Sequence, residues 1–274
     1  MKYDVAKKII EQAILAATNI SAKFNRRYFD YQKFIIFSLG RTGSSYLVSL
    51  LNSHPRIQCY SEVFHKNHAI FYELDNFRKS SNELLTLREK DPIDFLNQFI
   101  YRGHSKKMRA VGFKAVYVQM IDERFKQIPQ YLKSLNNLKI IYLRRENSLK
   151  AFISLLMAKR TLVWRITKPS MQFDEPIRLN FKECLKAFKA RQRHSDLLRA
   201  FFDPHETLEL TYEDLTRDVA FETAQIQAFL GIKPIELSSP LLKQNIRSLQ
   251  ESILNYHELK DQFKDMPWAK YFDE

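Results

Sequence analysis

The chain has 274 residues, of which 45% are apolar and 27% are charged, a balance typical of a folded domain with a sizeable core. Its two cysteines, Cys59 and Cys184, lie far apart in the sequence and predict neither a disulfide framework nor a zinc ligand set. No apolar run is long enough to cross a bilayer. We therefore expect a protein of a reducing compartment, the cytoplasm, with no membrane-spanning segment.

The net charge of +13 is concentrated in residues 139–199, where 15 Lys and Arg stand against 5 Asp and Glu. Concentrated positive charge favours an anionic partner. Nucleic acid, a phosphorylated cofactor and an anionic glycan all satisfy this condition, so charge alone does not choose among them.

Residues 1–32 are predicted to form an N-terminal helical segment. Lys7, Lys8 and Glu11 interrupt its apolar residues, so it lacks the apolar stretch of a cleaved signal peptide. The pattern fits an amphipathic helix that either packs on the domain or lies on a membrane surface.

Short apolar runs alternate with helical patterns along the rest of the chain. Residues 33–39 are largely apolar, as in a strand buried on both faces of a parallel sheet, and apolar residues recur at helical spacing from residue 46. Further strands are expected at 57–60, 110–116, 139–143 and 207–211, with helices at 147–159 and 213–230, the latter ended by Gly231. This order predicts an α/β fold of three layers, with a central parallel sheet flanked by helices.

We expect one domain over residues 1–274, with its core at 33–256 and a C-terminal tail at 257–274. Residues 66–109 and 161–180 show the least regular patterns. They are candidates for substrate-facing insertions or lids, because loops commonly carry specificity.

The loop at residues 40–46 follows the first strand and opens a helix. It holds Gly40 and Gly43, two of only five glycines in the chain. Backbone N–H groups at a helix start lack partners and attract phosphate groups, and Arg41 adds a fixed charge. The loop is not a Walker A loop, which has four residues between its glycines and a Lys after the second. The alternative is a turn in which a Ser caps the helix.

The segment at 37–55, FSLGRTGSSYLVSLLNSHP, resembles the 5′-phosphosulfate-binding loop of sulfotransferases, and most closely that of carbohydrate sulfotransferases such as the bacterial Nod-factor and trehalose enzymes. The resemblance implies a P-loop-NTPase-like sulfotransferase fold. It also implies PAPS (3′-phosphoadenosine 5′-phosphosulfate) as donor, PAP as product and no metal. Arg41 would stabilise the bridging oxygen as the leaving group departs. The implied donor-binding residues of the loop are Arg41, Thr42, Gly43, Ser44, Ser45 and Tyr46.

A second motif ends the strand at 139–143. Arg144 and Arg145 stand at the strand end and Ser154 follows in the next helix, and two guanidinium groups there could hold a phosphate bidentately. The motif resembles the family's 3′-phosphate-binding segment, with either arginine as the main contact. The alternative is a pair of surface arginines and a solvated serine.

A third motif, Tyr-Glu-Asp-Leu at 212–215, precedes a helix that ends in Phe-Leu-Gly at 229–231. It resembles a recurring sulfotransferase element, which implies that Tyr212 lies near the adenine. Its two acidic residues also fit an ordinary first helical turn. The segment at 242–245, with Lys243, resembles a late loop that closes over the nucleotide.

The acceptor hydroxyl requires a general base, and two candidates follow the second strand. Glu62 stands where carbohydrate-type enzymes of the family carry a Glu, whereas small-molecule enzymes use a His, for which His65 is the candidate. We favour Glu62. Lys114, in the third strand, either reaches the site or caps the sheet edge.

The resemblance thus predicts an enzyme that transfers a sulfonate group from PAPS to a hydroxyl of a carbohydrate, glycolipid or other small molecule. A nucleotide-dependent phosphotransferase is the alternative enzyme, and a metal requirement would distinguish it. A polyanion-binding protein without catalysis is the alternative from another class. We expect no nucleic-acid partner, because no nucleic-acid fold signature is present.

Overall fold

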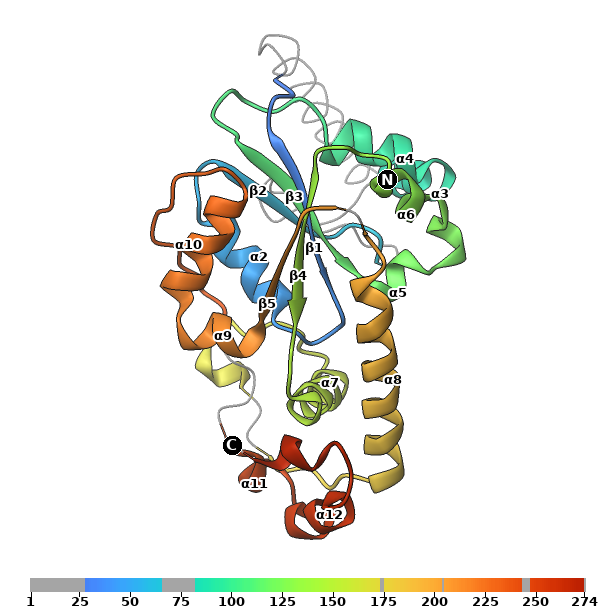
Figure 1. Ribbon diagram of the computed structural model, residues 1–274, viewed down its shortest axis with the longest axis vertical. Coiled ribbons are helices and arrows are strands. Elements are labelled where there is room, and N and C mark those ends of the chain that lie inside the picture. Colours follow the sequence, from blue (N-terminus) through green and yellow to red (C-terminus); the bar gives the residue numbers. More distant parts are fainter. Residues whose placement is uncertain (1–27, 66–81, 173–174, 204, 243–246, 274) are drawn as a thin grey trace, which may run out of the picture.

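A computed structural model describes residues 28–65, 82–172, 175–203, 205–242 and 247–273. In these residues five parallel strands form one sheet with the order β2-β3-β1-β4-β5 (Figure 1). The strands are β1 (Gln32–Ser38), β2 (Ile57–Glu62), β3 (Ala110–Val116), β4 (Leu138–Arg144) and β5 (Thr207–Thr211). All five were expected from the sequence. Strands β1 to β4 are mostly buried, whereas β5 is an edge strand in which Thr207 and Glu209 are exposed.

Helices cover both faces of the sheet, which confirms the three-layer architecture (Figure 1). One face packs against α2 (Ser44–Asn52), α9 (Tyr212–Arg217) and α10 (Val219–Phe229). The other face packs against α3 (Asn82–Lys90), α4 (Pro92–Phe95), η1 (Leu96–Ile100), α5 (Tyr117–Met120), η2 (Glu123–Phe125), α6 (Gln127–Lys133) and the end of α8 (Phe181–Arg199).

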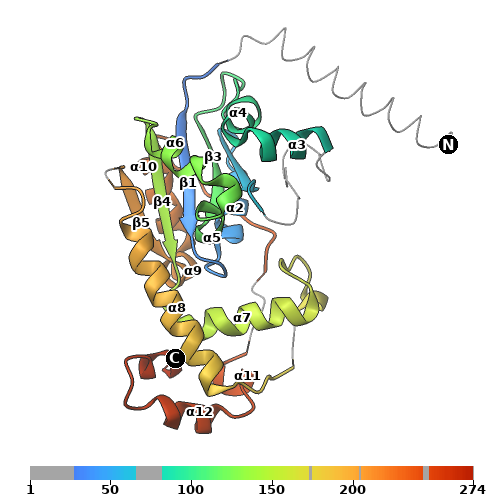
Figure 2. The ribbon, with the colours of Figure 1, turned by 90° about the vertical axis from the view of Figure 1, so that its right-hand side faces the viewer.

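A third group of helices lies beyond the carboxyl edge of the sheet (Figure 2). It contains α7 (Ser148–Thr161), the start of α8, α11 (Leu249–Ser252), α12 (Tyr256–Phe263) and η4 (Ala269–Phe272), while η3 (Pro169–Met171) lies in the connection from α7 to α8. Leu259, Phe263 and Phe272 are buried in this group. The segment expected as a tail thus packs against α7 and α8.

Two stretches differ from the sequence-based expectation. The helix expected at 213–230 is broken into α9 and α10 at Asp218, whose side chain caps α10 by accepting from the backbone N–H of Phe221. Residues 82–100, expected to be irregular, form α3, α4 and η1, which are too short to show a clear helical period. Gly231 has the expected left-handed backbone, with φ of 72°.

The topology places the loop after β1 at a crevice. The chain passes from β1 to β2 on one side and later to β4 on the other side of β1, and ligands of such sheets bind where the connections diverge, beyond the carboxyl ends. The carboxyl ends of the strands face α7 (Figures 1 and 2). Within the described part of the chain, no helix is both long and apolar enough to span a membrane.

Candidate active site

The loop between β1 and α2 has an unusual backbone. Arg41 and Gly43 both adopt positive φ angles, 63° and 79°. A Cβ atom on Gly43 would lie 2.3 Å from the ring of Tyr212, so only glycine fits there. Gly43 is also the N-cap of α2, and no side chain caps the helix. The alternative of a Ser cap is therefore wrong, and the N-terminus of α2 keeps its N–H groups available for an anion.

The side chain of Arg41 connects the loop to α7. Its Nε and Nη2 donate to Ser154 Oγ at 3.0 and 2.8 Å, and its Nη1 donates to the carbonyl oxygen of Trp164 at 3.3 Å. Burial, with a further contribution from nearby Arg145, lowers the pKa of Arg41 to about 10. Arg41 therefore stays charged at neutral pH. Its contact with Ser154 was not predicted, because the motifs place Arg41 at the 5′-phosphosulfate and Ser154 at the 3′-phosphate.

The two arginines at the end of β4 point in different directions. Arg145 turns to the loop, where Nη1 approaches the carbonyl oxygen of Arg41 at 3.4 Å and the guanidinium lies 4.6 Å from the centre of the Tyr212 ring. Arg144 instead pairs with Glu146 at 3.0 Å. Both side chains line the same cavity and each has a buried Nε without a partner in the described structure, but only Arg145 contacts the loop. Burial lowers the pKa of Arg145 as well.

Arg191, on α8, joins this cluster and was missed by the sequence analysis. Its Nη1 donates to the carbonyl oxygen of Gly40 at 2.9 Å, and burial together with the charge of Arg145 lowers its pKa to about 10. Arg191 Nη2 and Arg145 Nε are buried and have no hydrogen-bond partner in the described structure. Clustered guanidinium groups with unused donors are the arrangement that an anionic ligand would complete.

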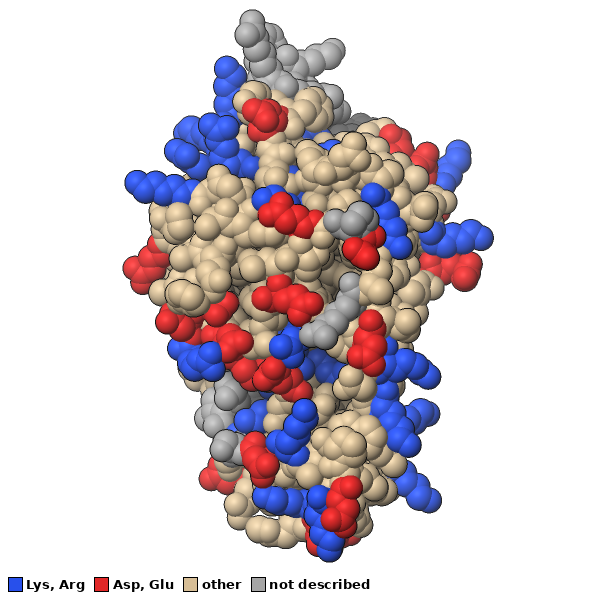
Figure 3. Space-filling view, in the orientation of Figure 1, with Lys and Arg blue, Asp and Glu red and all other residues tan. Residues whose placement is uncertain are grey.

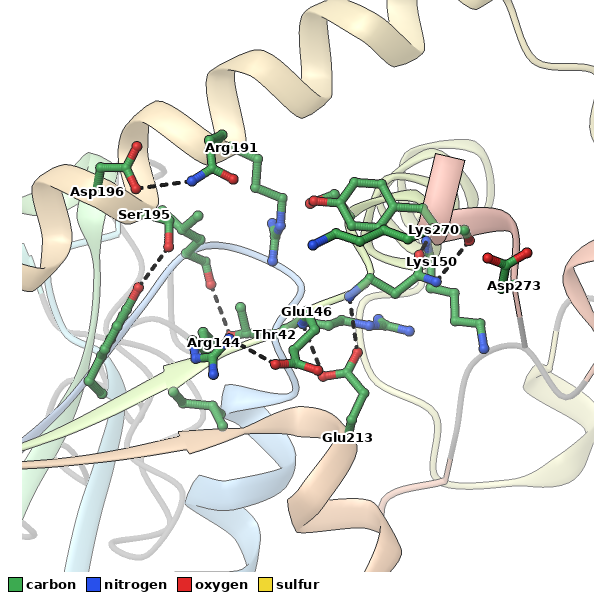
Figure 4. Close-up of a pocket in the computed structure, with 18 residues that line it drawn as sticks. Thr42, Arg144, Glu146, Lys150, Arg191, Ser195, Asp196, Glu213, Lys270 and Asp273 are labelled. Carbon is green, nitrogen blue, oxygen red and sulfur yellow. Dashed lines mark hydrogen bonds and ion pairs between the residues drawn. The ribbon is translucent and has the colours of Figure 1, made fainter. Parts of the chain in front are cut away.

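A cavity of 470 Å³ opens beside these arginines (Figure 4), within the range of small-molecule sites. Arg191 points into it from α8 toward Thr42 (Figure 4). Glu213 closes one side by accepting from the backbone N–H groups of Glu146 and Asn147 at 3.0 and 3.3 Å. Over the face drawn in Figure 3, acidic and basic side chains are interspersed, which gives no support to a polyanion-binding surface there.

Glu62, the last residue of β2, lies at the same edge of the sheet. Its carboxylate accepts from Lys114 Nζ and from Gln119 Nε2, each at 2.7 Å. Lys114 also donates to Ser45 Oγ at 3.0 Å, so one side chain joins the expected base to the expected donor loop. Lys114 thus reaches the site, and Gln119 is a second contact that sequence reasoning missed.

The pKa of Glu62 is lowered, although burial alone would raise it. The Lys114 charge and its hydrogen bond outweigh burial, with smaller contributions from His65 and Gln119. The carboxylate is therefore ionised and firmly oriented at neutral pH. His65 lies close enough to act on Glu62 electrostatically, whereas only Glu62 is connected to the loop, through Lys114 and Ser45.

The other expected residues lie as follows. Ser44 and Thr42 are buried, and Thr42 Oγ1 donates to the carbonyl oxygen of Leu39 at 3.0 Å. Tyr46 is half-buried on α2, and its pKa is raised by burial and by Tyr212. Tyr212 packs between Gly43 and Arg145. Lys243 lies outside the described residues.

Replacing Lys114 by Met is expected to raise the pKa of Glu62, because burial remains while the stabilising charge is lost. A base works only when deprotonated, so the acidic limb of the rate against pH should move from below the ordinary value of 4.5 to above it. Measurement of kcat from acidic to neutral pH checks this. The exposed Lys107 serves as control, since its replacement by Met should leave the limb unchanged. An unshifted limb in the Lys114 variant would contradict the electrostatic coupling.

The chain belongs to the sulfotransferase family, whose model matches residues 33–236. Nodulation protein H of Rhizobium tropici is 30% identical over 247 residues, which cover 88% of this chain and 93% of that protein. Nodulation protein H of Rhizobium meliloti strain 1021 is 29% identical, covering 88% and 95%.

Solved sulfotransferase structures are more distant. One from Alicyclobacillus acidocaldarius is 18% identical with a TM-score of 0.47, covering 86% of this chain and 93% of that one. A mouse sulfotransferase complexed with PAP is 17% identical with a TM-score of 0.42, covering 78% and 63%. In the described part of this chain, no cluster of three or more His, Cys, Asp or Glu side chains is arranged to hold a metal ion.

Proposed function

We propose that this sulfotransferase moves a sulfonate group from PAPS to a hydroxyl of a carbohydrate or glycolipid. The observation that supports the proposal is that three features lie together at the carboxyl ends of the strands. They are a helix N-terminus without a side-chain cap, a cluster of guanidinium groups with unused donors, and an oriented carboxylate. The loop's likeness to carbohydrate sulfotransferases supports the acceptor class. A cytoplasmic location stays a prediction.

The residues divide the task of holding the donor. The N-terminus of α2 and the hydroxyl groups of Ser44 and Ser45 are suited to the 5′-phosphosulfate, and Arg145 with Ser154 to the 3′-phosphate. Bound PAPS supplies an activated sulfonate on a good leaving group. Buried donors fixed before the reaction stabilise developing charge with little reorganisation.

Glu62 and Arg41 act on opposite sides of the transferred group. Glu62 accepts the proton of the acceptor hydroxyl as its oxygen forms a bond to sulfur. The bond from sulfur to the 5′-phosphate oxygen breaks, and Arg41 stabilises the negative charge that this oxygen gains. Arginine is a poor proton donor, so its role is electrostatic.

PAP is expected to bind and stabilise the folded protein. At a concentration of about 100 times Kd, the free energy of unfolding should increase by about 2.7 kcal/mol, which a thermal shift measures. ATP with Mg²⁺ should have a much smaller effect, because the loop lacks the Walker lysine. A shift with Mg-ATP and none with PAP would contradict the donor and favour a phosphotransferase.

The acceptor is addressed by a panel of oligosaccharides of glucose, galactose and N-acetylglucosamine, offered with radiolabelled PAPS. Transfer of label to at least one glycan is expected. Transfer only to phenols or other non-carbohydrate hydroxyl compounds would support PAPS as the donor but contradict a carbohydrate as the acceptor.

A further inference from the structure

Arg88, on α3, is the largest fully buried side chain outside the site described so far, with 0% of its surface exposed. No sequence motif marks Arg88, because it lies in a stretch without a clear helical period. Burying a guanidinium is costly unless it is paired and hydrogen-bonded. Its partners therefore show what the burial achieves.

Arg88 holds the backbone that directly follows Glu62. Its Nη1 donates to the carbonyl oxygens of Val63 and His65 at 3.1 and 3.4 Å. Nη2 and Nε donate to Glu89 at 2.6 and 3.2 Å, and the guanidinium lies 5.5 Å from the centre of the Phe125 ring. Glu89 thus holds the Nε and Nη2 side of the guanidinium, while Nη1 holds the turn after β2.

The same network reaches the second segment that contacts Glu62. Glu89 also pairs with Arg124 at 3.9 Å, and Arg124 pairs with Asp122 at 2.8 Å. These two residues follow α5, which carries Gln119, the donor to Glu62. The turn after β2 and the segment after β3 are therefore connected through Arg88, Glu89 and Arg124.

We propose that Arg88 is a positioning residue for Glu62. By fixing residues 63–65 against α3, it keeps the Glu62 carboxylate between Lys114 and Gln119, where the carboxylate faces the donor loop. The proposal rests on the proposed function of Glu62 as the base. Removing Arg88 alone leaves the Glu89 carboxylate and the carbonyl oxygens of Val63 and His65 without this donor, which lowers stability in either case. The positioning role is therefore tested by its effect on kcat and not by its effect on stability.

The test is a double-mutant cycle of Arg88→Met with Glu62→Gln. We expect Arg88→Met to lower kcat about 10- to 100-fold, as loss of supporting hydrogen bonds typically does, with the Kd of PAP unchanged within about twofold. In the Glu62→Gln background the same change should have no further effect, because residues that act as a unit are non-additive. The rate measured is transfer from PAPS to the best glycan of the panel, or to water if none reacts.

The control is Lys90→Met, on the same helix but exposed, which should leave kcat and Kd unchanged. If Arg88→Met does not fold, Arg88→Lys, which keeps the charge and loses the fork, carries the same cycle. An equal loss of rate with and without Glu62, or a rise in the Kd of PAP that matches the loss of rate, would overturn the positioning role. Normal turnover of Glu62→Gln alone would remove the base itself, and the positioning role with it.

Discussion

Glu62→Gln is expected to lower kcat by about 10² to 10⁴, the usual contribution of a general base, while PAP binding is retained. The change keeps the shape of the side chain and removes its charge and basicity. Because the carboxylate hydrogen-bonds to Lys114 and Gln119 rather than to the arginine cluster, the Kd of PAP should change far less than kcat. Steady-state kinetics and calorimetry with PAP measure the two quantities separately.

His65→Ala is the paired control, and its turnover should stay within about tenfold of that of the unmodified protein. The contribution of His65 to the lowered pKa of Glu62 is smaller than that of Lys114, and its backbone carbonyl, which accepts from Arg88, is kept in the alanine variant. If His65→Ala had no turnover and Glu62→Gln turned over at the unmodified rate, His65 and not Glu62 would be the general base.

Arg41→Ala is expected to lower kcat by about 10² to 10³, as removal of one donor to a developing oxyanion does. Alanine and arginine both carry a Cβ, so the positive φ at this position costs both residues alike. Ser154→Ala should mainly raise the KM for PAPS, since Ser154 is assigned to the 3′-phosphate. Rates at saturating and limiting PAPS distinguish the two effects.

The two side chains share two hydrogen bonds, so the double variant should be less damaged than the sum of the single changes predicts. An Arg41→Ala variant with an unchanged kcat and only a raised KM would show that Arg41 binds the donor without stabilising the leaving group.

The fold was largely predictable because the sheet is parallel and buried. The inner strands β3, β1 and β4 are then short, largely apolar runs, and Gly40 and Gly43 mark the β1–α2 loop in a chain with few glycines. The positions of Arg41, Ser154 and Glu62 followed from motifs in those regular elements. The need for glycine at 43 became clear only from the ring of Tyr212, which arrives from a distant segment.

The supporting residues were not predictable, because they too arrive from segments that are distant in the sequence. Arg191 on α8, Gln119 on α5 and Arg88 on α3 reach the site through helix packing, and in the sequence each resembles an ordinary surface residue. Arg144 and Arg145 show a related limit. Neighbouring residues at a strand end point to opposite sides, and only the structure shows that Arg145 faces the loop.

Transfer of radiolabelled sulfonate from PAPS to a glycan, followed by mass analysis of the product, tests the central claim most directly. We predict a sulfated glycan and stoichiometric PAP, without added metal ion and with the activity lost in Glu62→Gln. Binding of PAP without any transfer, or transfer of a phosphoryl group from Mg-ATP to the same glycans, would contradict the proposed reaction.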